Sequence, residues 1–149
     1  MNKYLAALLL GIAAAWANVA FAQTVTLSFR PVDSAYSKPL DRIIMISANP
    51  NQLHIYDPPT NSDVVVNLSK APLNLSVSPD GTHAAVMHDS LFSYVNLSTA
   101  RVEKTFAVAA NTGVVTLSDE YIYVLPTYEG QAYIIQISTG QITEGQGPF

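Results

Sequence analysis

Three histidines and eleven carboxylates are the side chains of this 149-residue sequence best suited to acid–base or metal chemistry. His83 and His88 lie five residues apart on one predicted strand, and an odd separation places their side chains on opposite faces. A metal site that joins His54, His88 and Asp89 would have to be assembled from different segments of the chain. We therefore expect solvent-facing or capping histidines and no metal site, and no residue is identified as catalytic.

Most of the carboxylates lie where turns are expected. Asp41, Asp80 and Asp119 recur in the first turn of three similar segments, and Gly81 follows Asp80. Aspartate accepts hydrogen bonds from nearby backbone amides, so we expect these four residues to be structural turn positions. A second interpretation stays open, in which recurring aspartates converge around a channel and bind calcium or a cationic ligand. The structural interpretation also applies to the residues that end a later strand of each segment: Asp57, Asn96 and Gln136.

Other patterns that could carry chemistry are weak. The tyrosines lie mostly in predicted strands, where core packing explains them. Three Asn-Leu-Ser triplets, at Asn67, Asn74 and Asn96, match the glycosylation pattern but also suit strand edges. The sequence contains no serine elbow, phosphate-binding loop or zinc motif. The lack of cysteine excludes disulfides, a cysteine nucleophile and lipid attachment after export, and no cofactor is indicated.

Composition favours a folded domain. Charged residues make up 12% of the sequence and hydrophobic residues 49%, which is unlike a disordered chain. The net charge is −4, so there is no basic surface to neutralise phosphates, and we expect no nucleic-acid partner.

Residues 1–22 have the three parts of a signal peptide. Lys3 gives the charged start, residues 4–16 form the apolar run, and Ala20-Phe21-Ala22 is a cleavage pattern that predicts cutting before Gln23. Cutting before Asn18 and an uncleaved membrane anchor over residues 4–22 are the alternatives. We expect a signal helix, removal of the leader, and a periplasmic or secreted mature protein that is not bound to a membrane.

The mature chain contains a repeat of about 40 residues. Residues 37–46 align with residues 78–87 and 118–124, and residues 27–31 align with residues 68–72. Each unit predicts four short strands, which in the second unit are residues 73–78, 82–88, 91–97 and 101–108. The second strand of each unit is apolar on both faces, as expected for a sheet stacked between two others.

The repeat resembles a known superfamily. Ser78-Pro79-Asp80-Gly81 with its following apolar strand, and Tyr121-Ile122-Tyr123-Val124, are similar to the YVTN-type repeats of WD40-like β-propellers. The sequence departs from that pattern in lacking the Gly-His and Trp-Asp pairs. The resemblance implies an all-β, partial β-propeller of about three four-stranded antiparallel blades. These blades span about residues 31–70, 72–110 and 112–149 of an incomplete propeller domain at residues 23–149.

Three blades are too few to close a ring, since propellers have four to eight. Residues 24–28 match residues 65–69 and are expected to form an outer strand that latches the ring. The bare end blades would be covered by further C-terminal blades, by self-association or by a protein partner. We expect an exported propeller that binds a protein or ligand. The alternative is the N-terminal part of an exported propeller enzyme, similar to lactonases or quinoprotein dehydrogenases.

Overall fold

The computed structural model describes residues 24–110, 113–125 and 131–146, and the expected signal helix lies outside these residues. The described part consists of strands and turns. Its strands are β1 (Pro31–Ser37), β2 (Arg42–Ala48), β3 (Asn51–Asp57), β4 (Ser62–Asn67), β5 (Pro72–Val77), β6 (His83–His88), β7 (Leu91–Asn96), β8 (Arg101–Ala107), β9 (Val114–Leu117), β10 (Tyr121–Leu125), β11 (Gln131–Gln136) and β12 (Ile142–Gln146). None of the described residues belongs to a helix long and apolar enough to cross a membrane.

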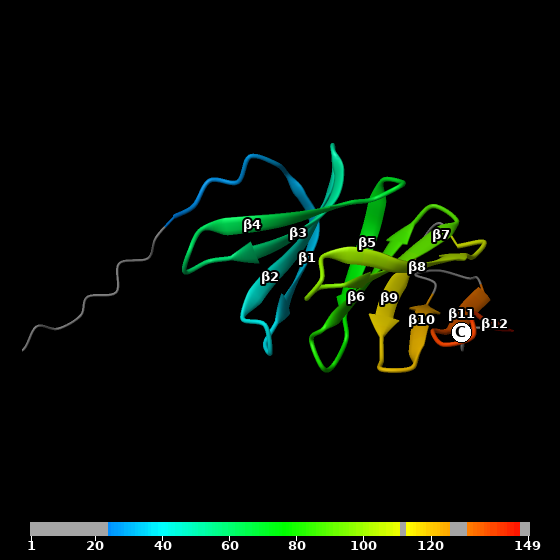
Figure 1. The fold of residues 1–149 in the computed structure, drawn as a ribbon. Helices are drawn as coiled ribbons and strands as arrows, with labels where there is room; N and C mark the ends of the chain where they lie inside the picture. The colour runs from blue at the N-terminus through cyan, green and yellow to red at the C-terminus, as the bar shows by residue number, and fades with distance from the viewer. Residues whose placement is uncertain (1–23, 111–112, 126–130, 147–149) are drawn as a thin grey trace, which may run out of the picture.

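The strands form three four-stranded sheets in which consecutive strands pair antiparallel. We name them blade 1 (β1–β4), blade 2 (β5–β8) and blade 3 (β9–β12). The blades stand side by side, and their first strands are neighbours, with β1 contacting β5 and β5 contacting β9 (Figure 1). The predicted all-β fold of three four-stranded antiparallel blades is confirmed.

Apolar residues on both faces of the inner strands explain why the blades stack. In β6, Ala84 and Val86 belong to the core shared with blade 1, whereas Ala85 and Met87 belong to the core shared with blade 3. We call the side of a blade that faces its predecessor the leading face and the opposite side the trailing face. Phe92 on the trailing face of blade 2 is completely buried, and its truncation to alanine is expected to cost about 3–5 kcal/mol.

Two kinds of turn fix the hairpins. In the third turn of each blade Asn61, Ala100 and Gly140 hold the same place, and all three have positive φ. In the first turn of blade 2, Gly81 has a φ of +70°, and a Cβ there would lie 2.5 Å from Pro39 Cδ of blade 1. Only glycine fits both the backbone and the close approach of blade 1.

The expectation of a strand at residues 24–28 is wrong. Residues 24–30 form no strand, because no blade edge of the described part pairs with them. Instead, Phe29 stacks on His54 of β3 with ring centroids 3.6 Å apart and an interplanar angle of 7°. The segment before β1 is therefore held by a side-chain contact rather than by a backbone ladder.

Candidate functional site

Polar side chains of the first strand of a blade accept hydrogen bonds from the backbone of the first strand of the following blade. Asp33 Oδ2 accepts a hydrogen bond from Leu75 N (2.9 Å), and Asn74 Oδ1 accepts one from Val115 N (3.0 Å). Asp33 and Asn74 hold the same place in the register of their blades. The corresponding residue of blade 3 is Val114, which has no polar side-chain atom to offer to a further blade.

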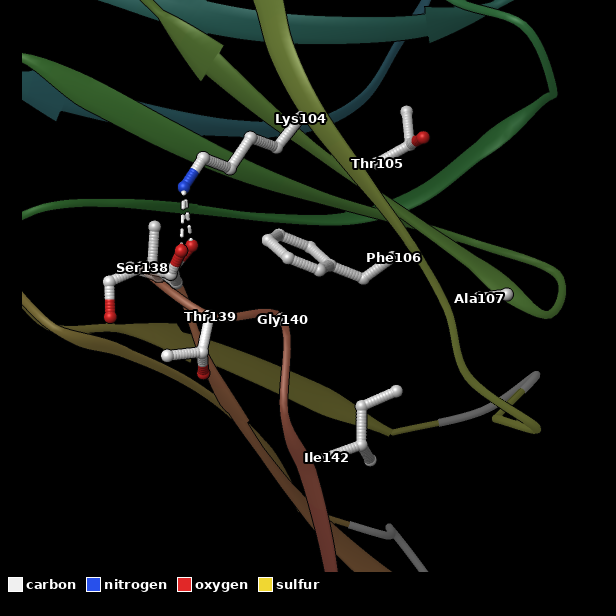
Figure 2. A pocket seen from close by; sticks show the side chains of 9 residues that line it. Lys104, Thr105, Phe106, Ala107, Ser138, Thr139, Gly140 and Ile142 are labelled. Carbon is white, nitrogen blue, oxygen red and sulfur yellow. Dashed lines mark hydrogen bonds between the residues drawn. The ribbon is translucent and has the colours of Figure 1, made fainter.

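A cleft of about 470 Å³ opens at the outer rim of the junction between blades 2 and 3. It lies between β8 and the turn that joins β11 to β12, and Figure 2 shows Lys104 and Phe106 pointing from β8 toward that turn. Lys104 Nζ donates to the carbonyl oxygens of Ile137 (2.7 Å) and Ser138 (3.4 Å). The cleft thus combines an ammonium group at its rim with the aromatic ring of Phe106 and the half-exposed side chain of Ile142.

The two junctions differ at one small residue beside the cleft. In the junction of blades 1 and 2, the methyl group of Ala100 packs against the shared core. Its counterpart Gly140 has no side chain, and a Cβ there would meet the Phe106 ring at an ordinary contact distance of 3.7 Å. The lysine is also peculiar to this junction, since Val64 holds the place of Lys104 in blade 1.

His54 is the buried centre of a chain of polar contacts on the leading face of blade 1. Its Nδ1 lies 2.8 Å from Asp63 Oδ2, and its Nε2 lies 3.1 Å from Ser47 Oγ. This arrangement has the residue types of a catalytic triad, but the Ser47 side chain is completely buried and its hydroxyl donates to Pro50 O (2.7 Å). A substrate has no access to this serine, so the chain of contacts ties three strands together.

His88 of blade 2 takes part in a separate pair. Its Nε2 lies 2.9 Å from Ser93 Oγ, and its Nδ1 lies 3.2 Å from Ala71 O. Burial lowers the pKa of His88, so the ring is neutral and donates to Ala71 O while accepting from Ser93. In register, His88 replaces Ser47 and Ser93 replaces His54, so the two blades hold the same pair in exchanged places.

The expectation of solvent-facing or capping histidines is wrong for His54 and His88, which are buried because strand neighbours satisfy their ring nitrogens, and the histidines do not share one site. His83, on the other face of β6 from His88, stacks on Tyr94 with ring centroids 4.7 Å apart and lies 3.4 Å from Glu103. Burial, with the negative charge of Glu103 as a smaller cause, raises the pKa of Tyr94. Among the residues that the structure describes, no three His, Asp or Glu side chains are grouped to hold a metal ion.

The aspartates of the first turns lie at different positions of those turns. Asp80 accepts hydrogen bonds from Ser78 Oγ, Thr82 N and Thr82 Oγ1, which lower the pKa of Asp80 to about 2. Asp41 has positive φ and accepts a bond of 2.6 Å from Tyr36 OH, which raises the pKa of Tyr36. Asp119 borders a shallow cleft beside Glu120 and Ser138.

Sequence analysis missed the role of Arg42. Asn96 caps its turn by accepting hydrogen bonds from Ser98 N and Thr99 N. Its counterpart in blade 1 is Asp57, which two prolines follow. The second of them, Pro59, takes the place of Ser98 and has no N–H to donate. Asp57 is held instead by Arg42, at 3.0 Å, and its Oδ1 has no hydrogen-bond partner.

The Arg42 guanidinium also replaces a backbone donor. In blade 2, Leu97 N donates to Thr82 O, whereas in blade 1 the corresponding residue is Pro58, which has no N–H. Arg42 Nη1 donates to Asp41 O at 2.8 Å, so the carbonyl group that proline leaves without a donor is satisfied. The Pro-Pro dipeptide after a strand, with an arginine at the facing strand start, was the signal available in the sequence.

The trailing face of blade 3 is apolar and exposed. Leu125 is 49% exposed and Ile134 39%, although the residues at the same places in blades 1 and 2 are at most 9% exposed. Those buried counterparts are Ile46 and Met87 for Leu125, and Ile55 and Tyr94 for Ile134. This face has the composition of a blade junction without the blade that would cover it.

Comparison with known proteins gives a fold and no family. No protein-family model matches the sequence, and no curated protein matches it either. Solved structures do match, among them a Kuenenia stuttgartiensis hydrazine synthase chain, with a TM-score of 0.66 and 16% identity over 81% of this chain and 37% of that one.

Two further matching structures are a β-propeller domain and a set of WD40 repeats. The β-propeller domain of Cps50 (Swd1) from Myceliophteria thermophila matches with a TM-score of 0.70 and 14% identity, covering 84% of this chain and 41% of that one. The RRP9 WD40 repeats match with a TM-score of 0.67 and 12% identity, covering 83% and 40%. The chain thus spans about two fifths of the length of these structures. At these identities the likeness concerns the fold, which is that of three blades of a WD40-like β-propeller.

Proposed function

We propose that this chain is an exported propeller arc, built from YVTN-type repeats, that binds another protein once a further blade covers its trailing face. The observation that carries this proposal is the exposure of Leu125 and Ile134 at places that are buried in both other blades. Exposed contiguous apolar surface of this kind marks an interaction site in a folded protein. The further blade belongs to a longer polypeptide or to a second copy of the chain.

The leading face of blade 1 is a poor candidate for the covering blade. Ser34 N is already bound by Asp33 Oδ1 at 2.8 Å, and the hydroxyl of Tyr36 is bound by Asp41. Phe29 lies over His54 on the same face. A covering blade from another part of the polypeptide is therefore favoured over head-to-tail contact between copies.

The trailing face can be tested with single cysteines, because the sequence contains none. Ile134→Cys probes the exposed face, and Ile55→Cys is the matched buried control at the same place of blade 1. In the purified chain, kept dilute enough to stay monomeric, we expect a maleimide to modify the cysteine at 134 much faster than the one at 55. In intact cells we expect modification at 134 to slow to the rate at 55, and unchanged fast modification in cells would contradict the proposal.

Export is tested separately. The chain is expressed in bacteria, and the periplasmic fraction is analysed by intact-mass spectrometry. We expect a mass that begins at Gln23, as the cleavage pattern predicts. The full-length mass in the membrane fraction would instead support the uncleaved anchor.

The alternative, an N-terminal part of a propeller enzyme, has one observation in its favour, which is the likeness to a hydrazine synthase chain. Against it, Ser47, His54 and Asp63 are engaged in the structural contacts described above. Hydrolysis of a lactone panel, or a dependence of activity on calcium or a quinone, would favour the enzyme.

A further inference from the structure

We propose that the cleft between blades 2 and 3 binds an extended peptide, which adds to β8 as a fifth strand of blade 2 and directs an acidic and an apolar side chain, two residues apart, into the cleft. This inference rests on the proposed binding function and assigns it a site and a partner class. It uses a surface separate from the trailing face of blade 3.

The outer edge of β8 offers free backbone groups beside the cleft. β8 is the last strand of its sheet and pairs only with β7 among the described strands. Val108 N donates inward to Ser90 O, and because N–H groups alternate along a strand, those of Thr105 and Ala107 point outward. Both residues line the cleft, so a peptide bound to them would lie along its rim.

The charged side chains nearest the cleft, Glu103 and Lys104, do not guard this edge. Edge strands usually avoid pairing by presenting lysine or other charges to a neighbouring strand. Here, Lys104 is bound to the carbonyls of Ile137 and Ser138, and Glu103 is bound to Asn96 Nδ2 at 2.9 Å. These contacts draw both side chains toward the blades, which leaves the backbone of β8 accessible.

The cleft would receive every second side chain of the added strand. Lys104 and Phe106 share the trailing face of β8, so alternate peptide side chains on that face would point toward Phe106 and Ile142. Gly140 leaves room for them, whereas Ala100 fills the same place in the first junction. Side chains of the size of valine or isoleucine fit this apolar surface.

Charge favours an acidic residue beside Lys104, two residues away from the apolar residue that lies beside Phe106 and on the same face of the added strand. β8 is the one described strand with two cationic residues, Arg101 and Lys104, in a chain of net charge −4. None of the ion pairs in the described part of the chain includes Lys104, whose bonds are to neutral carbonyls. A carboxylate of the peptide would therefore give this ammonium group its first anionic partner.

The affinity test measures, by fluorescence anisotropy, the binding to the purified chain of a fluorescein-labelled eight-residue peptide in which valine and glutamate alternate along one face and threonine occupies the other face. We expect saturable binding, with Kd raised about tenfold by Lys104→Gln, since losing a charge-assisted hydrogen bond costs about 1.4 kcal/mol or more. Lys70→Gln is the matched control, because Lys70 also donates to a backbone carbonyl, that of Asp89, outside the cleft. The same peptide with lysine in place of glutamate is expected not to bind.

The position of the peptide is tested by amide hydrogen exchange. We expect the amides of Thr105 and Ala107 to become protected when the peptide binds, and the outer strand β4 of blade 1 to be unaffected. Absence of saturable binding, equal effects of Lys104→Gln and Lys70→Gln, or protection of β4 instead of β8 would each overturn the proposal. The cysteine assay at position 134 does not involve the cleft, so failure here and failure of the proposed function are distinguishable.

Discussion

The two end faces of the arc are built from equivalent positions but have opposite chemistry. The leading face of blade 1 carries Ser47, His54 and Asp63 in one chain of hydrogen bonds, covered by the ring of Phe29. The trailing face of blade 3 carries exposed Leu125 and Ile134, and its inner strand has Val114 where the other blades have a polar clamp. The polar groups of the leading face are hydrogen-bonded within blade 1, whereas the apolar side chains of the trailing face need another blade to bury them.

This difference distinguishes a capped end from an unfinished end. Repeat proteins need terminal units whose outer face is not purely apolar, because each inner unit relies on both neighbours for burial. Blade 1 meets this condition through His54 and its partners, whereas blade 3 keeps the apolar pattern of an inner blade. The comparison supports the proposal that a further blade covers the trailing face of blade 3.

Of the substitutions at the two end faces, removal of His54 is expected to cause the largest loss of stability. His54→Ala leaves the Asp63 carboxylate and the Ser47 hydroxyl with fewer partners and removes the stacking partner of Phe29, so we expect a loss of about 2–3 kcal/mol in the free energy of unfolding. The matched change on the other end, Ile134→Ala, is expected to change it by less than about 0.5 kcal/mol. Urea unfolding of both variants measures the contrast, and equal losses would argue against it.

Arg42→Ala tests a smaller part of the blade 1 chemistry. The substitution removes the donor to Asp41 O and the ion pair with Asp57, and we expect a loss of about 2 kcal/mol. Adding Pro58→Leu restores the N–H that the corresponding Leu97 donates in blade 2, so it should recover part of the loss. Urea midpoints of the single and double variants decide the matter, and no recovery would mean that the missing proline donor is not what Arg42 replaces.

A weaker effect is expected for Asp80, in the inner blade between the two ends. Its folded pKa of about 2 lies below the ordinary value of 3.8, so its contribution to stability is present above about pH 4 and is lost as the pH falls toward 2. The urea midpoint of the wild type should therefore exceed that of Asp80→Asn at pH 6 by more than at pH 2.5. A pH-independent difference would show that the charge of Asp80 is not involved.

Much of the fold could be predicted because local sequence patterns indicate where each strand begins and ends. No end of β5–β8 differs by more than one residue from the strands predicted at residues 73–78, 82–88, 91–97 and 101–108. The prediction succeeds because apolar runs and turn residues mark the strands. Contacts between strands and blades have no such local signature. The His54 chain depends on the register of three strands, and the cleft is lined by Phe106 and Gly140 from two different blades.

The failed expectation at residues 24–28 has the same cause. These residues share the pattern of an outer strand, but a strand needs a partner edge, and backbone pairing is not encoded in one segment. The sequence also showed no sign that His54 and His88 would be buried, since only the folded positions of Asp63, Ser93 and Glu103 decide the partners of the histidines.

The most direct test of the account is light scattering on the purified chain, with and without Leu125→Glu. The substitution places a charge on an exposed side chain, so the free energy of unfolding should change by less than about 0.5 kcal/mol. We expect the wild type to associate as its concentration rises, because its trailing face lacks a covering blade, and the variant to remain monomeric. A wild-type chain that stays a monodisperse monomer would contradict the claim that this face is built to be covered.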